Sequence, residues 1–179
     1  MKLNLGCGDT RYPGFANVDR LQGADVAHDL EVHPWPWPDS SVDEVRAYHL
    51  LEHLRDLPGF MRELYRVCAP GALVDVAVPH PRHDDFLSDP THVRPVTFQT
   101  MRLFSRRLNL EWREQGWSDS RLALENGVDF EPLREERELE PYVQAALDSG
   151  ALPPESLELA VRQLCNIVKQ ARFLLRVVK

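Results

Sequence analysis

Five of the seven histidines of this chain fall in two short segments. His49 and His53 lie close together, and the polar stretch 79–95 holds the other three beside several aspartates. Imidazole exchanges a proton near neutral pH, so these histidines could act as general bases. Imidazole and carboxylate groups are also metal ligands. The two segments are therefore the first candidates for a chemical role.

A glycine turn near the start of the chain is a candidate ligand site. The apolar run Leu3-Asn4-Leu5 leads into Gly6-Cys7-Gly8. Glycines in such a turn let a ligand approach the backbone, and ligands of open α/β sheets bind beyond the carboxyl ends of the strands. Asp19 ends the next expected strand and could accept hydrogen bonds from both hydroxyls of a ribose. The turn alone also fits a tight bend with no ligand.

The elements that must position these residues alternate between strands and helices. Leu57, Phe60, Met61 and Leu64 recur at helical spacing, whereas the prolines of segment 33–41 exclude regular structure there. We predict strands at 2–5, 15–19, 24–28, 42–48, 72–78, 127–138 and 172–178, and helices at 56–68, 97–104, 141–147 and 154–170. This order predicts an α/β fold with an open, mostly parallel sheet and an antiparallel edge strand.

Several motifs follow one another in a recognisable order. They are Leu-Asn-Leu-Gly-Cys-Gly, Asp19, Asp29-Leu30, the run Pro34–Asp43, and His49-Leu50-Leu51-Glu52-His53 followed by Arg66–Gly71. Together they resemble the class I S-adenosylmethionine-dependent methyltransferases, in particular the small bacterial group with a type 11 methyltransferase domain. The resemblance covers roughly residues 2 to 104.

The resemblance implies a Rossmann-like fold and a methyltransferase that uses S-adenosyl-L-methionine and releases S-adenosyl-L-homocysteine. The acceptors of this family include sugars, lipids, small metabolites and proteins, and we predict a small-molecule or sugar acceptor with a hydroxyl or amine group. The cofactor-binding residues that it implies are Leu5, Gly6, Cys7, Gly8, Asp19, Arg20, Asp29, Leu30, Tyr48 and His49. We expect the loop that contains His80, Asp89, His92 and Arg94 to close over the acceptor.

His92 is the first candidate for the general base and His49 the second. Each histidine also has a structural alternative: His92 could order its loop through the backbone, and His49 could pack beside the cofactor. Arg94 could pair with an anionic acceptor or with Asp89. We expect no metal ligands.

One departure from the family concerns the first crossover. Only about ten residues separate Gly8 from Asp19, too few for the usual crossover helix. We therefore expect that helix to be shortened, which leaves one face of the sheet thinly covered. The predicted helix 154–170, or a second subunit in a homodimer, would cover it. We expect a single domain, with residues 1–104 as the cofactor-binding core and 105–179 as a variable part that completes the sheet and covers the site.

Three other functions stay open. The cluster His80, His83, Asp84, Asp85, Asp89 and His92 could serve a metal-dependent hydrolase. A dinucleotide-dependent oxidoreductase requires Gly-x-Gly-x-x-Gly, but Arg11 occupies the third glycine position. A non-catalytic interaction module could keep the cofactor fold. Metal analysis and turnover assays distinguish these functions.

Composition and net charge limit the kinds of partner and cellular location that the sequence predicts. The net charge of −7 disfavours nucleic acid. No apolar run approaches the roughly 20 residues of a membrane span, and the N-terminus lacks the features of a signal peptide. The three cysteines are far apart, which fits reduced thiols. We expect a cytoplasmic protein without a membrane span.

Overall fold

Seven strands form one sheet in the order β3-β2-β1-β4-β5-β7-β6 in the computed structural model, which describes residues 1–179. The strands are β1 (Lys2–Leu5), β2 (Ala16–Asp19), β3 (Val26–Ala27), β4 (Val42–Tyr48), β5 (Cys68–Pro79), β6 (Phe130–Leu139) and β7 (Val168–Val177). Strands β1 to β5 pair in parallel, and β7 is antiparallel to both β5 and β6. The expected mostly parallel sheet is confirmed, but its antiparallel strand lies inside the sheet and not at the edge.

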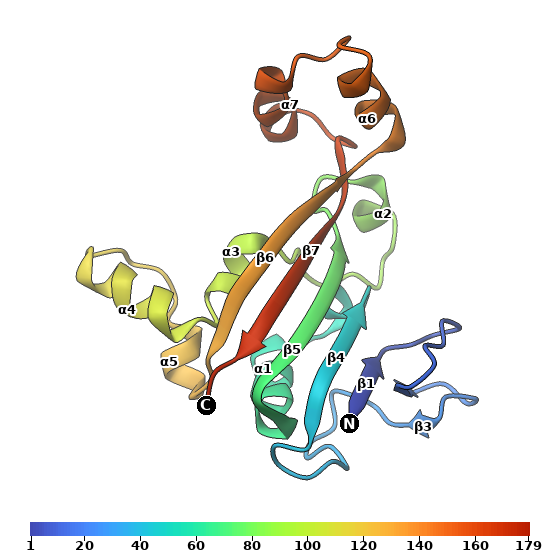
Figure 1. Ribbon diagram of the computed structural model, residues 1–179, viewed down its shortest axis with the longest axis vertical. Helices are drawn as coiled ribbons and strands as arrows, with labels where there is room; N and C mark the ends of the chain where they lie inside the picture. Colours follow the sequence, from blue (N-terminus) through green and yellow to red (C-terminus); the bar gives the residue numbers. More distant parts are fainter.

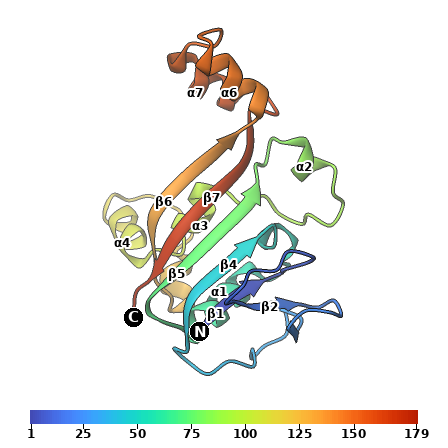
Figure 2. The same ribbon diagram turned by 45° about the vertical axis from the view of Figure 1, so that its right-hand side comes forward.

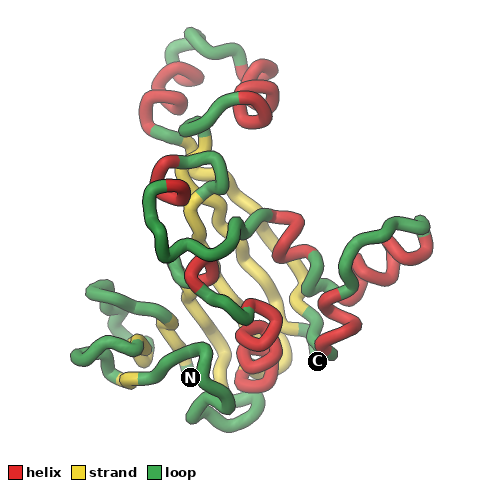
Figure 3. Tube along the Cα trace, turned by 180° about the vertical axis from the view of Figure 1, so that it is seen from behind, coloured by secondary structure: helices red, strands yellow, loops and turns green.

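Helices lie mainly on one face of this sheet. They are α1 (Leu57–Val67), α2 (Asp84–Leu87), α3 (Phe98–Arg102), α4 (Arg106–Glu114), α5 (Leu122–Asn126), α6 (Pro141–Asp148) and α7 (Leu157–Gln163), with 3-10 turns η1 (Leu51–His53) and η2 (Pro154–Ser156). Figure 1 views the sheet from the face that carries no helix, and Figure 3 shows α1 and α3 against the opposite face. None of the helices is long and apolar enough to span a membrane.

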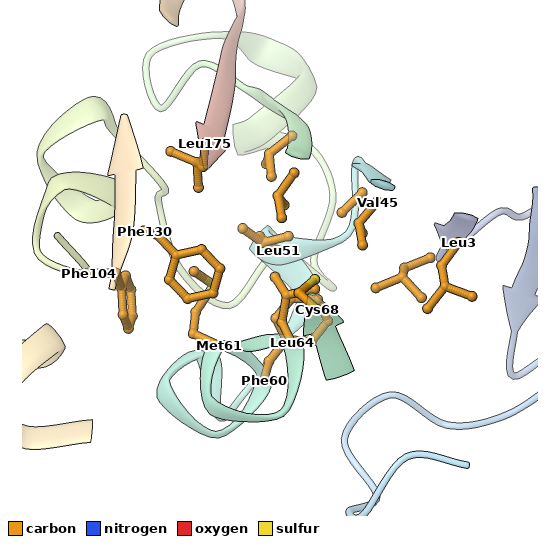
Figure 4. Close-up of a cluster of buried hydrophobic side chains, with 14 of the residues drawn as sticks. Leu3, Val45, Leu51, Phe60, Met61, Leu64, Cys68, Phe104, Phe130 and Leu175 are labelled. Atoms are coloured by element: carbon orange, nitrogen blue, oxygen red, sulfur yellow. The ribbon is translucent and has the colours of Figure 1, made fainter. Parts of the chain in front are cut away.

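Helix α1 supplies the largest part of the core that supports the sheet. The Asp56 carboxylate caps it by accepting from the Gly59 N–H at 2.8 Å, which satisfies one of the free donors of the first turn. Phe60, Met61 and Leu64 face inward, and each is 1% exposed (Figure 4). The predicted helix is confirmed. It ends at Val67 because the chain is already extended at Cys68, so β5 begins four residues before the predicted start.

No helix joins β1 to β2. The chain turns through residues 6–15, and a polar network takes over the role of the crossover helix in fixing the two strands. Asn4 donates its side-chain amide to Asn17 at 2.9 Å, and Asn17 donates its own to Asp25 at 2.7 Å. The Arg46 guanidinium lies 4.5 Å from the ring centroids of both Tyr12 and Phe15. The aromatic rings of this short connection pack against Arg46 of β4, in the part of the sheet that was expected to be thinly covered.

The expectation that helix 154–170 covers the cofactor region is wrong. Helix α7 ends at Gln163, and Val168 already belongs to β7, because pairing with β5 and β6 fixes that segment in an extended form. Helices α6 and α7 project beyond the end of the β6–β7 hairpin, far from β1 and β2 (Figures 1 and 2). Their small core consists of Val143, Val161, Ile167 and Val168.

Other boundaries also differ from prediction. The strand expected at 127–138 begins only at Phe130, because Gly127 adopts a positive φ of 65° and ends α5. Helix α2 interrupts the expected loop 79–95, and α4 and α5 occupy residues for which periodicity predicted nothing. Arg102 of α3 pairs with Glu135, and Arg107 of α4 pairs with Glu131.

Candidate functional site

A cleft of about 730 Å³ lies beyond the carboxyl ends of β1, β2, β3 and β4. This edge of the sheet is where parallel α/β folds bind their ligands. Seven of the residues that the sequence assigned to the cofactor line it: Gly6, Gly8, Asp19, Arg20, Asp29, Leu30 and His49. The fold thus brings together three separate motifs along one wall.

The glycine turn at Gly6–Gly8 exposes backbone to the cleft. Gly6 and Gly8 have φ values of 64° and 49°, which L-residues with a side chain rarely adopt. A Cβ at Gly6 would lie 2.9 Å from the Leu50 side chain, so this position excludes any larger residue. A Cβ at Gly8 would point into open space. The turn therefore offers a bare backbone surface to a ligand.

Asp19 is held at the end of β2 by backbone donors. Its Oδ2 accepts from the Gly8 N–H and its Oδ1 from the Leu21 N–H, each at 2.9 Å. These bonds fix the carboxylate in the cleft wall and leave further lone pairs on both oxygens. The geometry suits a group that accepts hydrogen bonds from neighbouring hydroxyls.

A tryptophan positions the Asp29-Leu30 part of the cleft wall. Trp35 is 2% exposed, packs edge-on against Phe60 at 5.1 Å, and donates its indole N–H to the Leu30 carbonyl at 3.1 Å. The Asp29 carboxylate accepts from the Glu31 N–H at 3.0 Å. Neither Trp35 nor Trp37 lines the cleft. The two tryptophans therefore cover core and position the Asp29-Leu30 pair from behind.

Three predicted cofactor residues lie outside the cleft wall, namely Leu5, Cys7 and Tyr48. Leu5 and Cys7 are buried, and burial raises the pKa of the Cys7 thiol. Tyr48 faces the helix-free side of the sheet and donates to the Asp75 carboxylate at 2.8 Å. Burial, together with the Asp75 hydrogen bond, raises its pKa to about 12. Side chains alternate along a strand, so Tyr48 points away from its neighbour Ala47, which faces the core.

His49 follows directly and lies in the cleft wall. Its φ of 52° is in the left-handed region, a strained conformation for a non-glycine residue that often marks functional positions. Its Nε2 lies 3.1 Å from the Gln170 side-chain oxygen, and its Nδ1 lies 3.5 Å from Glu52 Oε1. The nearby Glu52 carboxylate raises the pKa of the ring, against the effect of burial.

The four residues predicted to hold the acceptor do not line the cleft, although Pro90, Thr91 and Val93 of the same loop do. The His92 side chain is 8% exposed and its Nδ1 bonds to the Phe86 carbonyl at 2.9 Å. Arg94 donates to the Leu54 carbonyl at 2.9 Å. Asp89 accepts from Thr91, and His80 accepts from the Arg82 N–H. In this structure the four residues organise the loop that borders the cleft.

The structure also shows two residues to which the sequence gave no role. Thr91 lines the cleft beside the candidate base His53, and the Glu52 carboxylate is buried nearby. An acid among the leucines of Leu-Leu-Glu-His-Leu is the only sequence signal for this burial. The loop cluster considered for a metal hydrolase does not gather, because His83 bonds to Glu140 at 2.8 Å, while His92 lies against Glu52.

Comparisons with known proteins agree with this geometry. Residues 13–74 match the family model described as a methyltransferase domain. This match covers about a third of the chain. The methyltransferase fold that the motifs implied is confirmed, and the matched residues support the methyltransferase domain that they implied. S-adenosylmethionine is the cofactor of that family.

A solved S-adenosylmethionine-dependent methyltransferase from Archaeoglobus fulgidus aligns with a TM-score of 0.65 and 18% identity, over 98% of this chain and 85% of that one. The [4+2]-cyclase SpnF aligns with a TM-score of 0.57 and 17% identity, over 99% of this chain and 75% of that one. Ajmaline N-methyltransferase from Rauvolfia serpentina is 46% identical over 39 residues, which are 22% of this chain and 13% of that enzyme. A cyclase shares the fold, so fold alone does not define the reaction.

Proposed function

We propose that this chain binds S-adenosylmethionine in the cleft and transfers its methyl group to a hydroxyl or amine of a small-molecule or sugar acceptor. The observation that carries this proposal is the convergence of the Gly6–Gly8 turn, Asp19, the Asp29-Leu30 pair and His49 on one cleft. The volume of about 730 Å³ falls in the range of small-ligand sites.

Each residue of the cleft has a role in this proposal. When bound, the cofactor supplies a methyl group on a sulfonium, which is a good leaving group. Asp19 accepts hydrogen bonds from the ribose hydroxyls, and Asp29 with Leu30 contacts the adenine. The turn at Gly6 and Gly8 admits the rest of the cofactor to the backbone. The protein's main contribution is the relative position of acceptor and methyl group.

His49 is the better placed of the two predicted bases, since it lies in the cleft wall whereas His92 does not line the cleft. The hydrogen bond between its Nε2 and the Gln170 side-chain oxygen holds the ring in place. The size of the cleft supports a small acceptor, and the net charge of −7 disfavours nucleic acid. The Rauvolfia relative is an N-methyltransferase by name, so amines belong among the acceptors to be tested. We also propose that the protein is located in the cytoplasm and forms a homodimer.

The test is calorimetric titration of S-adenosylhomocysteine into the wild type and Asp19→Asn. The variant loses charge-assisted bonds to two hydroxyls, and we expect affinity to fall by about 30-fold or more, equivalent to roughly 2 kcal/mol. Asp148→Asn, at the end of α6, is the matched control and should bind as the wild type does. Equal affinity of Asp19→Asn and wild type would show that the ribose lies elsewhere.

Turnover with a panel of amines, alcohols and sugars then tests the reaction. His49→Gln should lower kcat by about 100-fold or more if its imidazole takes the acceptor proton. Its affinity for S-adenosylhomocysteine should stay within a few-fold of that of the wild type. Undiminished kcat in His49→Gln with a large loss in His92→Gln would assign the base to His92. Tight binding without turnover on any acceptor would favour the non-catalytic module.

A further inference from the structure

The Glu52 carboxylate has an environment that the proposed methyl transfer does not explain. Its side chain is 1% exposed, and neither of its oxygens has a hydrogen-bond partner. A buried carboxylate normally has its charge balanced and its lone pairs satisfied, because desolvation is costly. The groups within 4.0 Å that could carry positive charge are His49 and His92. No lysine or arginine pairs with it.

Two histidines beside Glu52 are held with one ring nitrogen free. His53 Nδ1 lies 3.0 Å from Thr91 Oγ1, whose own proton goes to Asp89 at 2.6 Å, so the imidazole donates. His92 Nδ1 donates to the Phe86 carbonyl at 2.9 Å. In each neutral ring the lone pair is therefore on Nε2. Metal-binding histidines commonly have their second nitrogen fixed in this way.

The backbone holds the two halves of this cluster together. Glu52 and His53 belong to η1, and His92 belongs to the loop that borders the cleft. The Val93 N–H donates to the Glu52 carbonyl at 2.9 Å, which ties the loop to η1. The rings of His53 and His92 lie 4.7 Å apart. The arrangement is therefore built by the fold and does not depend on exposed, mobile side chains.

We propose that Glu52, His53 and His92 bind a divalent transition-metal ion. Their candidate ligand atoms all lie within 4.8 Å of one another. Atoms about 2.1 Å from a common Zn²⁺ lie roughly 3.4 Å apart in a tetrahedron, so small side-chain rotations complete the site. Two imidazoles and one carboxylate suit Zn²⁺, Fe²⁺ or Co²⁺ better than Ca²⁺ or Mg²⁺. The bound ion balances the buried charge of Glu52.

The position of the ion links it to the cleft. His53 and Thr91 are both in the cleft wall, and three protein ligands leave the ion with an open coordination position. Asp89 Oδ2 lies 3.7 Å from His92 Nε2 and is the nearest further carboxylate. The site differs from the loop cluster considered from the sequence, because two of its three ligands come from η1. The proposal departs from the expectation that the chain holds no metal ligands.

The test is metal binding by protein first stripped with a chelator. Co²⁺ is titrated and followed by its visible absorption, and Zn²⁺ is then added in competition. We expect one ion per chain in the wild type, and binding weaker by about 100-fold or more in Glu52→Gln, His53→Gln and His92→Gln. His33→Gln, on an exposed loop outside the site, is the control and should bind as the wild type does.

Thermal unfolding distinguishes a folding defect from a lost ligand. Zn²⁺ should raise the melting temperature of the wild type and of His33→Gln, because it binds the folded state. Metal-free Glu52→Gln should be folded and at least as stable as metal-free wild type, since it buries no charge, and Zn²⁺ should leave it unchanged. No Co²⁺ spectrum in the wild type, or equal binding by folded Glu52→Gln, would overturn the proposal. Asp19→Asn should still bind the metal, so failure of the metal site and failure of the cofactor site are separable.

Discussion

At the scale of single residues, the helix-free face of the sheet depends on polar side chains that satisfy one another. Asp75 on β5 accepts from Tyr48 on β4 at 2.8 Å and from the Arg172 guanidinium on β7 at 2.9 Å. Burial opposes ionisation of Asp75, but the bonds from Arg172 and Tyr48 hold its pKa below the usual value. Three strands are thus joined across a surface that the fold leaves without a covering helix.

This network predicts a pH dependence of stability. Burial and Asp75 raise the pKa of Tyr48 from 10.0 to about 12 in the folded protein. Between these two values the folded state binds more protons than the unfolded state, so the free energy of unfolding falls as pH rises. We expect a steeper fall in the wild type than in Tyr48→Phe, measured by urea unfolding from pH 9 to 12, a range set by the two pKa values. Parallel slopes would contradict this assignment.

At the scale of elements, the helical extension at the end of β6 and β7 is the most independent part of the chain. Its small apolar cluster is separate from the main core, and Figure 2 shows α6 and α7 standing clear of the sheet. Its links to the remainder include the hydrogen bond of His83 with Glu140 and the bond from the Asp84 N–H to Asn166. All cleft-lining residues lie at or before Val93.

We therefore predict that the extension is dispensable for cofactor binding. Replacing residues 141–166 by Asn-Gly, which favours a tight hairpin turn, should leave a folded protein. Its affinity for S-adenosylhomocysteine should stay within about three-fold of the wild type, since no ligand contact is removed. Calorimetry and circular dichroism measure both properties. A large loss of affinity in a folded variant would mean that the extension reaches the cleft.

At the scale of the whole molecule, the last strand is part of the central core. Strand β7 lies between β5 and β6 and contributes Phe173, Leu175 and Val177 to the large buried cluster. Phe173 is 1% exposed and packs edge-on against Phe98 of α3 at 5.3 Å. The proposed division into a core at 1–104 and a variable part at 105–179 therefore describes the location of the site and not independent folding.

Phe173→Ala should destabilise the whole protein by about 3–5 kcal/mol, because it removes a buried ring and leaves a cavity. Leu159→Ala, at a position that is 56% exposed on α7, should change stability by less than about 0.5 kcal/mol. Denaturant unfolding of both variants gives the comparison. A small effect of Phe173→Ala would mean that residues 1–104 hold their fold without the tail.

The sequence by itself determined the parts of the protein that depend on local chemistry. Gly6 and Gly8 require a turn with positive φ, and Asp19 and Asp29 follow strands whose carboxyl ends must meet at one edge of a parallel sheet. The amphipathic spacing of Leu57, Phe60 and Leu64 fixed helix α1. These signals involve neighbours in the chain or a general rule of α/β folds, so they could be read without coordinates.

Tertiary structure alone decided the rest, because it depends on contacts between distant segments. Pairing with β5 and β6 made Val168 a strand residue where periodicity predicted a helix. Packing of the loop placed His92 against Glu52, 40 residues away in the chain, and left His92 out of the cleft lining. Whether a histidine faces a ligand, a carbonyl or a carboxylate is set by the packing of loops, and no local pattern encodes that packing.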